Sequence, residues 1–249
     1  MKTLCIANQK GGVGKSTLTA HLGWWAEQQG IDTLLVDLDG QSNTTRTFTD
    51  APTGLAASQL FEEEAAGEPQ RISRCLALIH ADLGINDVEG LPLDTIELPA
   101  RHLRRFDDRY DLCIIDTPPS LGRRLLAALI ASDVVVSPLA LNGYSLQGIE
   151  ALQQTIIRVR RRFNRGLRNL GILPNMVNRR SKTQGELLDA LRESLGDRVL
   201  PFELVHRVAV SDAVDQGRPV WRGTRGQSSL RASAEMRVVC KEIIERVLA

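Results

Sequence analysis

Short apolar runs alternate along the chain with longer segments in which apolar residues recur at helical spacing. The runs occupy residues 4–7, 33–37, 111–116, 133–138 and 170–175 and are rich in Val, Leu and Ile. Strands of a parallel sheet are buried on both faces, so they are apolar throughout rather than alternating with polar residues. The pattern therefore predicts an α/β fold with buried parallel strands.

Helical spacing of apolar residues predicts the elements between these runs. The predicted helices cover residues 18–26, 55–64, 94–106, 145–163, 183–195 and 228–248. Residues 76–79 are a candidate for a further strand, and we connect no chemistry with residues 76–106. In the last helix, Val239, Ile243 and Val247 recur at a spacing that fits packing on the sheet.

At 249 residues and 43% hydrophobic content, the chain can bury one sizeable core, and we expect a single domain over residues 1–249. Its four cysteines are scattered without CxxC spacing, so neither a disulfide framework nor a cysteine metal site is expected. The first strand begins almost at Met1, and no apolar run reaches the roughly 18 residues of a membrane span. These features predict a cytoplasmic protein.

The net charge of +1 conceals a strong asymmetry between the two parts of the chain. Residues 1–150 carry 12 Lys and Arg against 20 Asp and Glu, a net charge of −8. Residues 151–249 carry 19 against 10, a net charge of +9. Such asymmetry within one domain suggests a basic face, and a basic face suggests nucleic acid as a partner.

A glycine-rich loop follows the first apolar run. It reads Lys-Gly-Gly-Val-Gly-Lys-Ser-Thr from Lys10 to Thr17, between a predicted strand and a predicted helix. The glycines let several backbone N–H groups point at one anion, which is the chemistry of a phosphate-binding loop. Lys15 would reach the β- and γ-phosphates of a nucleotide, and the Ser16 hydroxyl would ligate Mg²⁺.

Two features distinguish this loop from the common Gly-x-x-x-x-Gly-Lys-Ser motif. Gln9 stands where that motif has its first glycine, and Lys10 adds a second lysine at the start of the loop. The stretch resembles the deviant Walker A box of the ParA/MinD ATPase superfamily and looks more like ParA than MinD. The resemblance implies a P-loop NTPase fold of this deviant type, with a doubly wound, mostly parallel sheet flanked by helices.

Two predicted strands end in carboxylates, and the carboxyl ends of parallel strands are where such sheets bind ligands. Asp37-Leu-Asp39 follows the strand at 33–37, and Asp116 ends the strand at 111–116 in a Walker B pattern. In the family that the chain resembles, the second aspartate of the first pair positions the attacking water, a role that falls to Asp39. Gly40 stands where that family has proline, so the stiffness of the loop is open.

The resemblance extends over nearly the whole chain, because the Gly-Arg-Pro-Val stretch at 217–220 also comes in family order. It implies a short ParA-type protein without a separate N-terminal DNA-binding domain. An asparagine at the end of the strand at 170–175 contacts adenine in this superfamily, which makes Asn175 a candidate; a turn-forming role is the alternative. The candidate nucleotide-binding residues are Lys10, Gly11, Gly12, Val13, Gly14, Lys15, Ser16, Thr17 and Asn175.

The resemblance also implies how the protein works. ATP and Mg²⁺, the latter held by Ser16 and Asp116, would join two copies of the chain into a homodimer with Lys10 reaching the partner's phosphates. The candidate catalytic residues are Lys10, Lys15, Asp39 and Asp116. Hydrolysis would be weak alone and stimulated by DNA and a ParB-like partner, and the ATP-bound protein would associate with the nucleoid.

Basic residues outside the loop supply candidates for a DNA-binding face. These candidates are Arg179, Arg180, Arg222, Arg225, Arg231, Arg237 and Lys241. A second basic cluster, from Arg158 to Arg168, ends a predicted helix, where cations are favourable even without a partner. Since no recognition helix or zinc motif is visible, sequence-independent binding to the DNA backbone is expected.

Three alternatives follow from the same motifs. The last helix could be an amphipathic membrane-targeting tail, as in MinD-like cell-division regulators, although Glu242 and Glu245 interrupt its basic face. The protein could position a protein cargo, such as carboxysomes or chemotaxis clusters, instead of a plasmid or chromosome. It could also be a metabolic relative, an amide-forming synthase or an iron–sulfur reductase; the scattered cysteines argue against the reductase.

Overall fold

A computed structural model describes residues 1–141, 145–223 and 225–249, apart from the side chains of residues 145–148, so Thr224 of the predicted basic loop lies outside it. It contains a seven-stranded sheet in the order β3-β4-β2-β5-β1-β6-β7. The strands are β1 (Lys2–Ile6), β2 (Thr33–Asp37), β3 (Gln70–Arg71), β4 (Leu76–Ile79), β5 (Leu112–Asp116), β6 (Val134–Ala140) and β7 (Arg168–Asn175). Among the strands of the described residues, only β3 pairs antiparallel, at the edge beside β4. The predicted doubly wound, mostly parallel sheet is confirmed.

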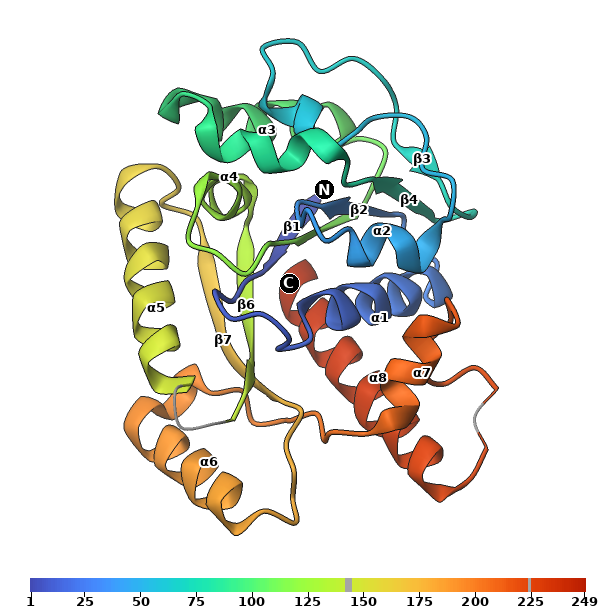
Figure 1. The fold of residues 1–249 in the computed structure, drawn as a ribbon, viewed down its shortest axis with the longest axis vertical. Coiled ribbons are helices and arrows are strands. Elements are labelled where there is room, and N and C mark those ends of the chain that lie inside the picture. The colour runs from blue at the N-terminus through green and yellow to red at the C-terminus, as the bar shows by residue number, and fades with distance from the viewer. Residues whose placement is uncertain (142–144, 224) are drawn as a thin grey trace.

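Helices cover both faces of this sheet, with α1, α7 and α8 on one side and α3, α4 and α5 on the other (Figure 1). The α-helices are α1 (Lys15–Gln28), α2 (Asn43–Phe48), α3 (Leu98–Leu103), α4 (Arg123–Ala131), α5 (Ser145–Arg162), α6 (Lys182–Leu195), α7 (Val208–Asp215) and α8 (Gln227–Leu248). The 3₁₀-helices are η1 (Ser58–Phe61), η2 (Leu83–Gly90), η3 (Leu93–Glu97), η4 (Arg104–Phe106) and η5 (Gly196–Arg198).

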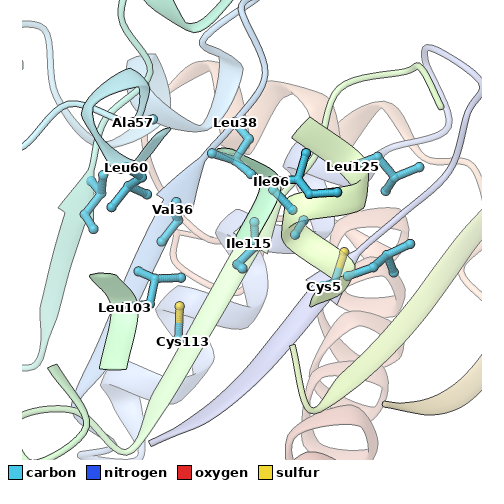
Figure 2. Close-up of a cluster of buried hydrophobic side chains, with 14 of the residues drawn as sticks. Cys5, Val36, Leu38, Ala57, Leu60, Ile96, Leu103, Cys113, Ile115 and Leu125 are labelled. Carbon is cyan, nitrogen blue, oxygen red and sulfur yellow. The ribbon is translucent and has the colours of Figure 1, made fainter. Parts of the chain in front are cut away.

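The strands are apolar throughout because successive side chains enter two different cores. In β1, Leu4 and Ile6 pack in the core beneath α1 and α8, whereas Cys5 packs in the opposite core. Figure 2 shows this second core, in which Cys5 and Cys113 point among side chains such as Leu103 and Leu125 from the covering helices. All four cysteines are free, as the sequence predicts.

Two predicted helices are wrong in extent. Residues 55–64 contain only η1, because the preceding segment is extended and Ala57 N donates to His80 O beside the end of β4 (2.8 Å). Residues 94–106 are divided into η3, α3 and η4, with Pro99 in the first turn of α3. Proline lacks an N–H and cannot continue a preceding helix, so a new helix begins there.

The remaining predicted helices and strands are present, with ends that differ by a few residues. In the part of the chain that the structure describes, no helix is both long enough and apolar enough to cross a bilayer. The terminal helix α8 uses its apolar side on the sheet, where Val239, Ile243, Ile244 and Val247 are almost completely buried.

Candidate nucleotide-binding site

The glycine-rich loop connects β1 to α1 at the carboxyl edge of the sheet. Gly12 and Gly14 both have positive φ, at 70° and 84°, a conformation that side-chain-bearing residues rarely adopt. Gly14 precedes α1, and no side chain among the described residues caps the N-terminus of this helix. The first N–H groups of α1 therefore point towards the loop without a side-chain acceptor, which is the arrangement that binds an anion.

Lys15 is nearly buried at the start of α1, with only 6% of its surface exposed. Its Nζ donates to the Lys10 carbonyl at 3.3 Å, which folds the side chain back along the loop. Burial lowers the pKa of Lys15, while the negative charges of Asp116 and Asp39 oppose this shift. Among the described residues, this buried cation has a single acceptor, the Lys10 carbonyl, so it is ready to receive an anionic ligand.

The carboxylates at the ends of β2 and β5 lie side by side. Asp37 and Asp116 are register partners in the parallel pair β2–β5, and both are fully buried. Burial and mutual repulsion raise the pKa of Asp37, and burial likewise raises the pKa of Asp116. Asp37 accepts hydrogen bonds from Thr45 N and Thr45 Oγ1, both at 2.8 Å, so it holds the start of α2.

Asp116 combines one satisfied oxygen with one that is not. Its Oδ2 accepts from Thr44 Oγ1 at 2.7 Å, and Ser16 lies close enough to lower the pKa of the carboxyl. Its Oδ1 is buried and has no hydrogen-bond partner of good geometry among the described residues. An orphaned carboxylate oxygen beside a serine hydroxyl fits the oxygen ligands that Mg²⁺ prefers, so Ser16 and Asp116 could hold this ion.

Asp39 lies in the turn that follows β2. Its backbone N donates to Asp37 Oδ1 at 3.1 Å, and its own Oδ1 accepts from Gln41 N at 3.0 Å. The side chain borders a cavity of about 570 Å³ together with the loop. Predicted residues around this cavity are Gly11, Gly12, Gly14, Lys15, Ser16, Thr17 and Asp39.

The same cavity is also lined by residues that the sequence does not predict to belong to the site. Arg46 and Thr47 from α2, Pro119 from the segment after β5, and Asp215 from α7 also line it. The α2 residues follow Asp39 closely and could have been suspected from the sequence. Asp215 comes from a helix that the sequence analysis did not predict, so no signal pointed to it.

Three of the predicted nucleotide-binding residues do not line this cavity, and neither does the predicted metal ligand Asp116. Val13 is buried, and its carbonyl accepts from Asn175 Nδ2 at 2.7 Å. Asn175 lines a smaller neighbouring cavity of about 70 Å³ with Met176 and His206. Lys10 is half-buried at the start of the loop, and among the described residues its Nζ has no hydrogen bond or ion pair. The structure thus puts Asn175 against the loop, and it puts Lys10 outside the cavity of its own chain.

His21 is a buried residue of α1 that hydrogen-bonds to two parts of the chain, one of them distant in sequence, and the sequence gives no sign of this role. Its Nδ1 lies 2.7 Å from Thr17 O, and its Nε2 accepts from Val220 N at 3.2 Å. Burial lowers the pKa of His21 to about 4, so the ring is neutral, with Nδ1–H donating to the carbonyl. His21 therefore connects the end of the phosphate-binding loop to the chain just before the basic loop at 221–225.

The basic candidates differ in how firmly they are held. Arg179 forms an ion pair with Glu203 at 3.0 Å, and Lys241 lies 3.8 Å from Glu245. Arg237 lies over Trp221 and Trp25, with its guanidinium carbon 5.1 and 5.7 Å from the ring centroids.

The other candidates are more open. Arg180, Arg222, Arg225 and Arg231 are exposed. In the second basic cluster, Arg160, Arg161 and Arg165 line an open groove of about 550 Å³ at the end of α5.

Comparisons with known proteins agree with this architecture. A family model described as an AAA domain matches residues 1–169. The protein IncC of Escherichia coli is 36% identical over 263 residues, covering 99% of this chain and 70% of IncC. The chromosome-partitioning ATPase Soj of Treponema pallidum is 33% identical over 230 residues, covering 88% of each chain.

Among solved structures, the ATP complex of a McdA variant from Cyanothece superposes with a TM-score of 0.84 at 21% identity, covering 98% of this chain and 96% of McdA. A putative plasmid partition protein of Borrelia burgdorferi gives a TM-score of 0.78, also at 21% identity, over 97% and 99% of the two chains. The matched family model, the curated relatives and the fold agree: the chain belongs to this AAA domain family and to the ParA/MinD superfamily of deviant Walker A ATPases.

Proposed function

We propose that the protein is a dimerising ATPase that binds DNA without sequence preference and drives partition of a plasmid or chromosome. The observation that carries the proposal is the buried Lys15 at the uncapped start of α1, facing a cavity that Asp39 borders and beside which Asp116 is buried. The names of the relatives, which include partition ATPases, support the biological role.

The proposed chemistry is phosphoryl transfer from ATP to water. Its transition state spreads negative charge over the phosphate oxygens, so catalysis consists mainly of positioning and of placing cations. Lys15 and the N–H groups of the loop bind the phosphates, and Asp39 orients the attacking water. Ser16 and Asp116 would hold Mg²⁺, which would neutralise phosphate charge when bound.

Dimerisation would complete the site. The Lys10 amine does not line the cavity of its own chain and has no partner among the described residues, which supports a role towards a second copy. A lysine supplied by the partner would make hydrolysis depend on assembly. Asn175 would contact the adenine from the neighbouring small cavity.

DNA binding would follow from the same assembly. Two copies bring together two basic surfaces, and each phosphate contact adds to counterion release, so affinity rises steeply with pairing and falls with salt. A ParB-like protein on the cargo would stimulate hydrolysis and release the dimer from DNA. The protein would then alternate between the nucleoid and the cytoplasm.

The deciding experiment measures binding to random-sequence duplex DNA without nucleotide, with ADP and with ATP, each over a salt series. We expect binding only with ATP, and we expect it to weaken as salt rises. Equal binding in all three nucleotide states would contradict the ATP-dependent switch. Absence of binding in every state would remove DNA from the proposal, and sedimentation with anionic liposomes would then test the MinD-like alternative.

A further inference from the structure

The turn that carries Asp39 lacks the proline expected from the family resemblance, yet it is held from outside. Leu38, directly before Asp39, donates its N–H to Asp116 O at 3.0 Å. The Leu38 carbonyl accepts from Arg124 Nη1 at 3.3 Å. Arg124 is in the first turn of α4 and is only 8% exposed, so its guanidinium reaches the backbone of the turn from beneath the surface.

Arg124 is itself fixed by η2. Its Nε donates to Glu89 Oε1 at 2.9 Å, and its Nη1 also lies 3.2 Å from Asn86 Oδ1. The Arg124 guanidinium and the Glu89 carboxylate form an ion pair whose side chains are 9% and 33% exposed. A hydrogen-bonded ion pair of this kind is directional, because the planar guanidinium offers its donors in a fixed fork. We call Leu38, Asn86, Glu89 and Arg124 the Arg124 cluster.

Asn86 also occupies the space beside Gly40. A Cβ atom placed on Gly40 would lie 2.1 Å from Asn86 Oδ1, well inside the closest contact that such atoms make. The absence of proline and the presence of Asn86 are therefore two parts of one arrangement. In the resembled family a proline ring would stiffen this turn, whereas here contacts with η2 and α4 restrain it.

Glu89 ties the same cluster to the segment that follows Asp116. Its Oε2 accepts from Arg123 N at 2.7 Å, which supplies a cap to a helix whose own N-cap residue, Gly122, has no side chain. A carboxylate is favourable at this end of a helix. Because α4 begins directly after residues 117–122, one short 3₁₀-helix contacts both the Asp39 turn and the end of the segment after β5.

We infer that Arg124 is a positioning residue for Asp39, an inference that rests on the proposed role of Asp39 in hydrolysis. Arg124 does not line the nucleotide cavity, so its effect passes through the Leu38 carbonyl. A displacement of about 1 Å in a catalytic group can lower a rate by a large factor while leaving substrate binding intact. The expected signature is a loss in kcat without a matching change in KM.

The test measures ATP turnover of the full chain with DNA present. Arg124→Met should lower kcat about tenfold and change KM for ATP by less than about twofold. Arg124→Lys should recover part of the activity, because lysine can reach a single acceptor but lacks the fork. Arg123→Met is the matched control: the Arg123 side chain donates to the Glu89 carbonyl on the same pair of elements, whereas the hydrogen bond to the Leu38 carbonyl comes from Arg124. We expect it to retain the wild-type kcat.

If the Arg124 cluster acts by restraining the Asp39 turn, then stiffening the turn with proline should compensate for loss of the cluster. Asn86→Ala removes the side chain that blocks position 40, and Gly40→Pro then restores the ring that this position has in the resembled family. Combined with Arg124→Met, this pair should recover most of the lost turnover. If Arg124 only supported the fold, a proline at position 40, which lies beside Asn86 but outside the Arg124 cluster, would not restore turnover.

Amide hydrogen exchange provides a readout that does not depend on hydrolysis. Arg124→Met should speed exchange in residues 38–43 more than Arg123→Met does. Unchanged exchange together with unchanged kcat in Arg124→Met would overturn the inference. Asp39→Ala in the ATP turnover assay separates this inference from the proposed function. Wild-type turnover in Asp39→Ala would contradict the proposed role of Asp39. An inactive Asp39→Ala beside a fully active Arg124→Met would contradict only the positioning role of Arg124.

Discussion

The nucleotide site and the seven basic residues proposed to bind DNA, which we call the basic surface, are built in opposite ways. In the site, Lys15, Asp39 and Asp116 are nearly or fully buried. Each is fixed by strand register, by helix position or by hydrogen bonds to neighbours. On the basic surface, Arg222, Arg225 and several other cations are exposed.

The difference teaches what kind of substitution each region can tolerate. A site that places charge on a transition state requires one residue at one position, because burial makes each contact strong and each loss uncompensated. A surface that attracts a polyanion requires a sum of charges, and neighbouring arginines can replace one another. Single substitutions should therefore break the first region, and only combined substitutions should break the second.

The largest expected effect is that of Lys15→Ala. The substitution removes the buried cation that lines the cavity. We expect ATP affinity to fall more than about a hundredfold, because hydrogen bonds between a charged amine and phosphate are strong in a buried site and water cannot replace them there. Isothermal titration with a non-hydrolysed ATP analogue measures it. The thermal midpoint without nucleotide should not fall, since burial of this cation is unfavourable by itself. Retained tight binding would refute the assignment of the loop.

The basic surface should respond to charge reversal at several positions together. Replacing Arg222, Arg225 and Arg231 by Glu should weaken DNA binding about a hundredfold and reduce the slope of log affinity against log salt by about three for each subunit. ATP-dependent dimers should still form, as measured by light scattering. If the variant still bound DNA, the DNA-binding site would have to be assigned to the basic cluster between Arg158 and Arg168 instead.

A control of equal net charge separates location from total charge. Arg71, Arg74 and Arg104 are exposed in the acidic part of the chain, and replacing them by Glu changes the charge by the same amount. This control should keep most of its DNA affinity. Equal weakening in both variants would show that net charge, not a defined surface, governs binding.

The smallest expected effect concerns the link between the two regions. His21 has a folded-state pKa lowered from 6.5 to about 4, so below pH 6.5 the unfolded chain binds a proton that the folded chain refuses. Its contribution to stability is thus complete above pH 6.5 and is lost as pH falls towards 4, by at most about 3 kcal/mol. Asp37 and Asp116, whose raised pKa values act in the opposite direction, are retained in any His21 variant.

The measurement compares urea unfolding of the wild type and His21→Gln between pH 4 and pH 8. At pH 8 the variant should be less stable by about 1–2 kcal/mol, because it loses the hydrogen bonds to Thr17 and Val220. On acidification to pH 4 the wild type should lose about 3 kcal/mol that the variant does not lose, so the difference in stability should reverse in sign. A gap that stays constant with pH would mean that His21 titrates normally in the folded protein.

The sequence predicted the fold and the centre of the site because both depend on local pattern. Apolar runs ending in Asp37 and Asp116 specify parallel strands whose carboxyl ends meet, and the glycine spacing specifies a loop between strand and helix. Residues of this kind are constrained by their immediate neighbours in the chain.

The remainder could not be predicted because it depends on contacts between distant segments. Nothing around His21 indicates that Val220 will donate to it across 199 positions. Likewise, nothing around Arg124 indicates that it will reach the Leu38 carbonyl 86 positions away. Asn175 is a candidate only through the family resemblance, and its hydrogen bond to the Val13 carbonyl depends on how β7 meets the loop. The roles of such residues are set by tertiary packing, which leaves no signal in the hydrophobic periodicity of the sequence.

The close approach of Gly40 and Asn86 also constrains how this chain can change over generations. A lineage that carries Asn86 can acquire a side chain at position 40 only if the Asn86 amide moves away, which also disturbs its contact with Arg124, whereas a lineage that first replaces Asn86 avoids this cost. The two positions, 46 apart in the sequence, therefore have a preferred order of substitution, and a change that is harmless in one background is harmful in the other. Relatives with proline at position 40 should be those with a smaller residue at position 86.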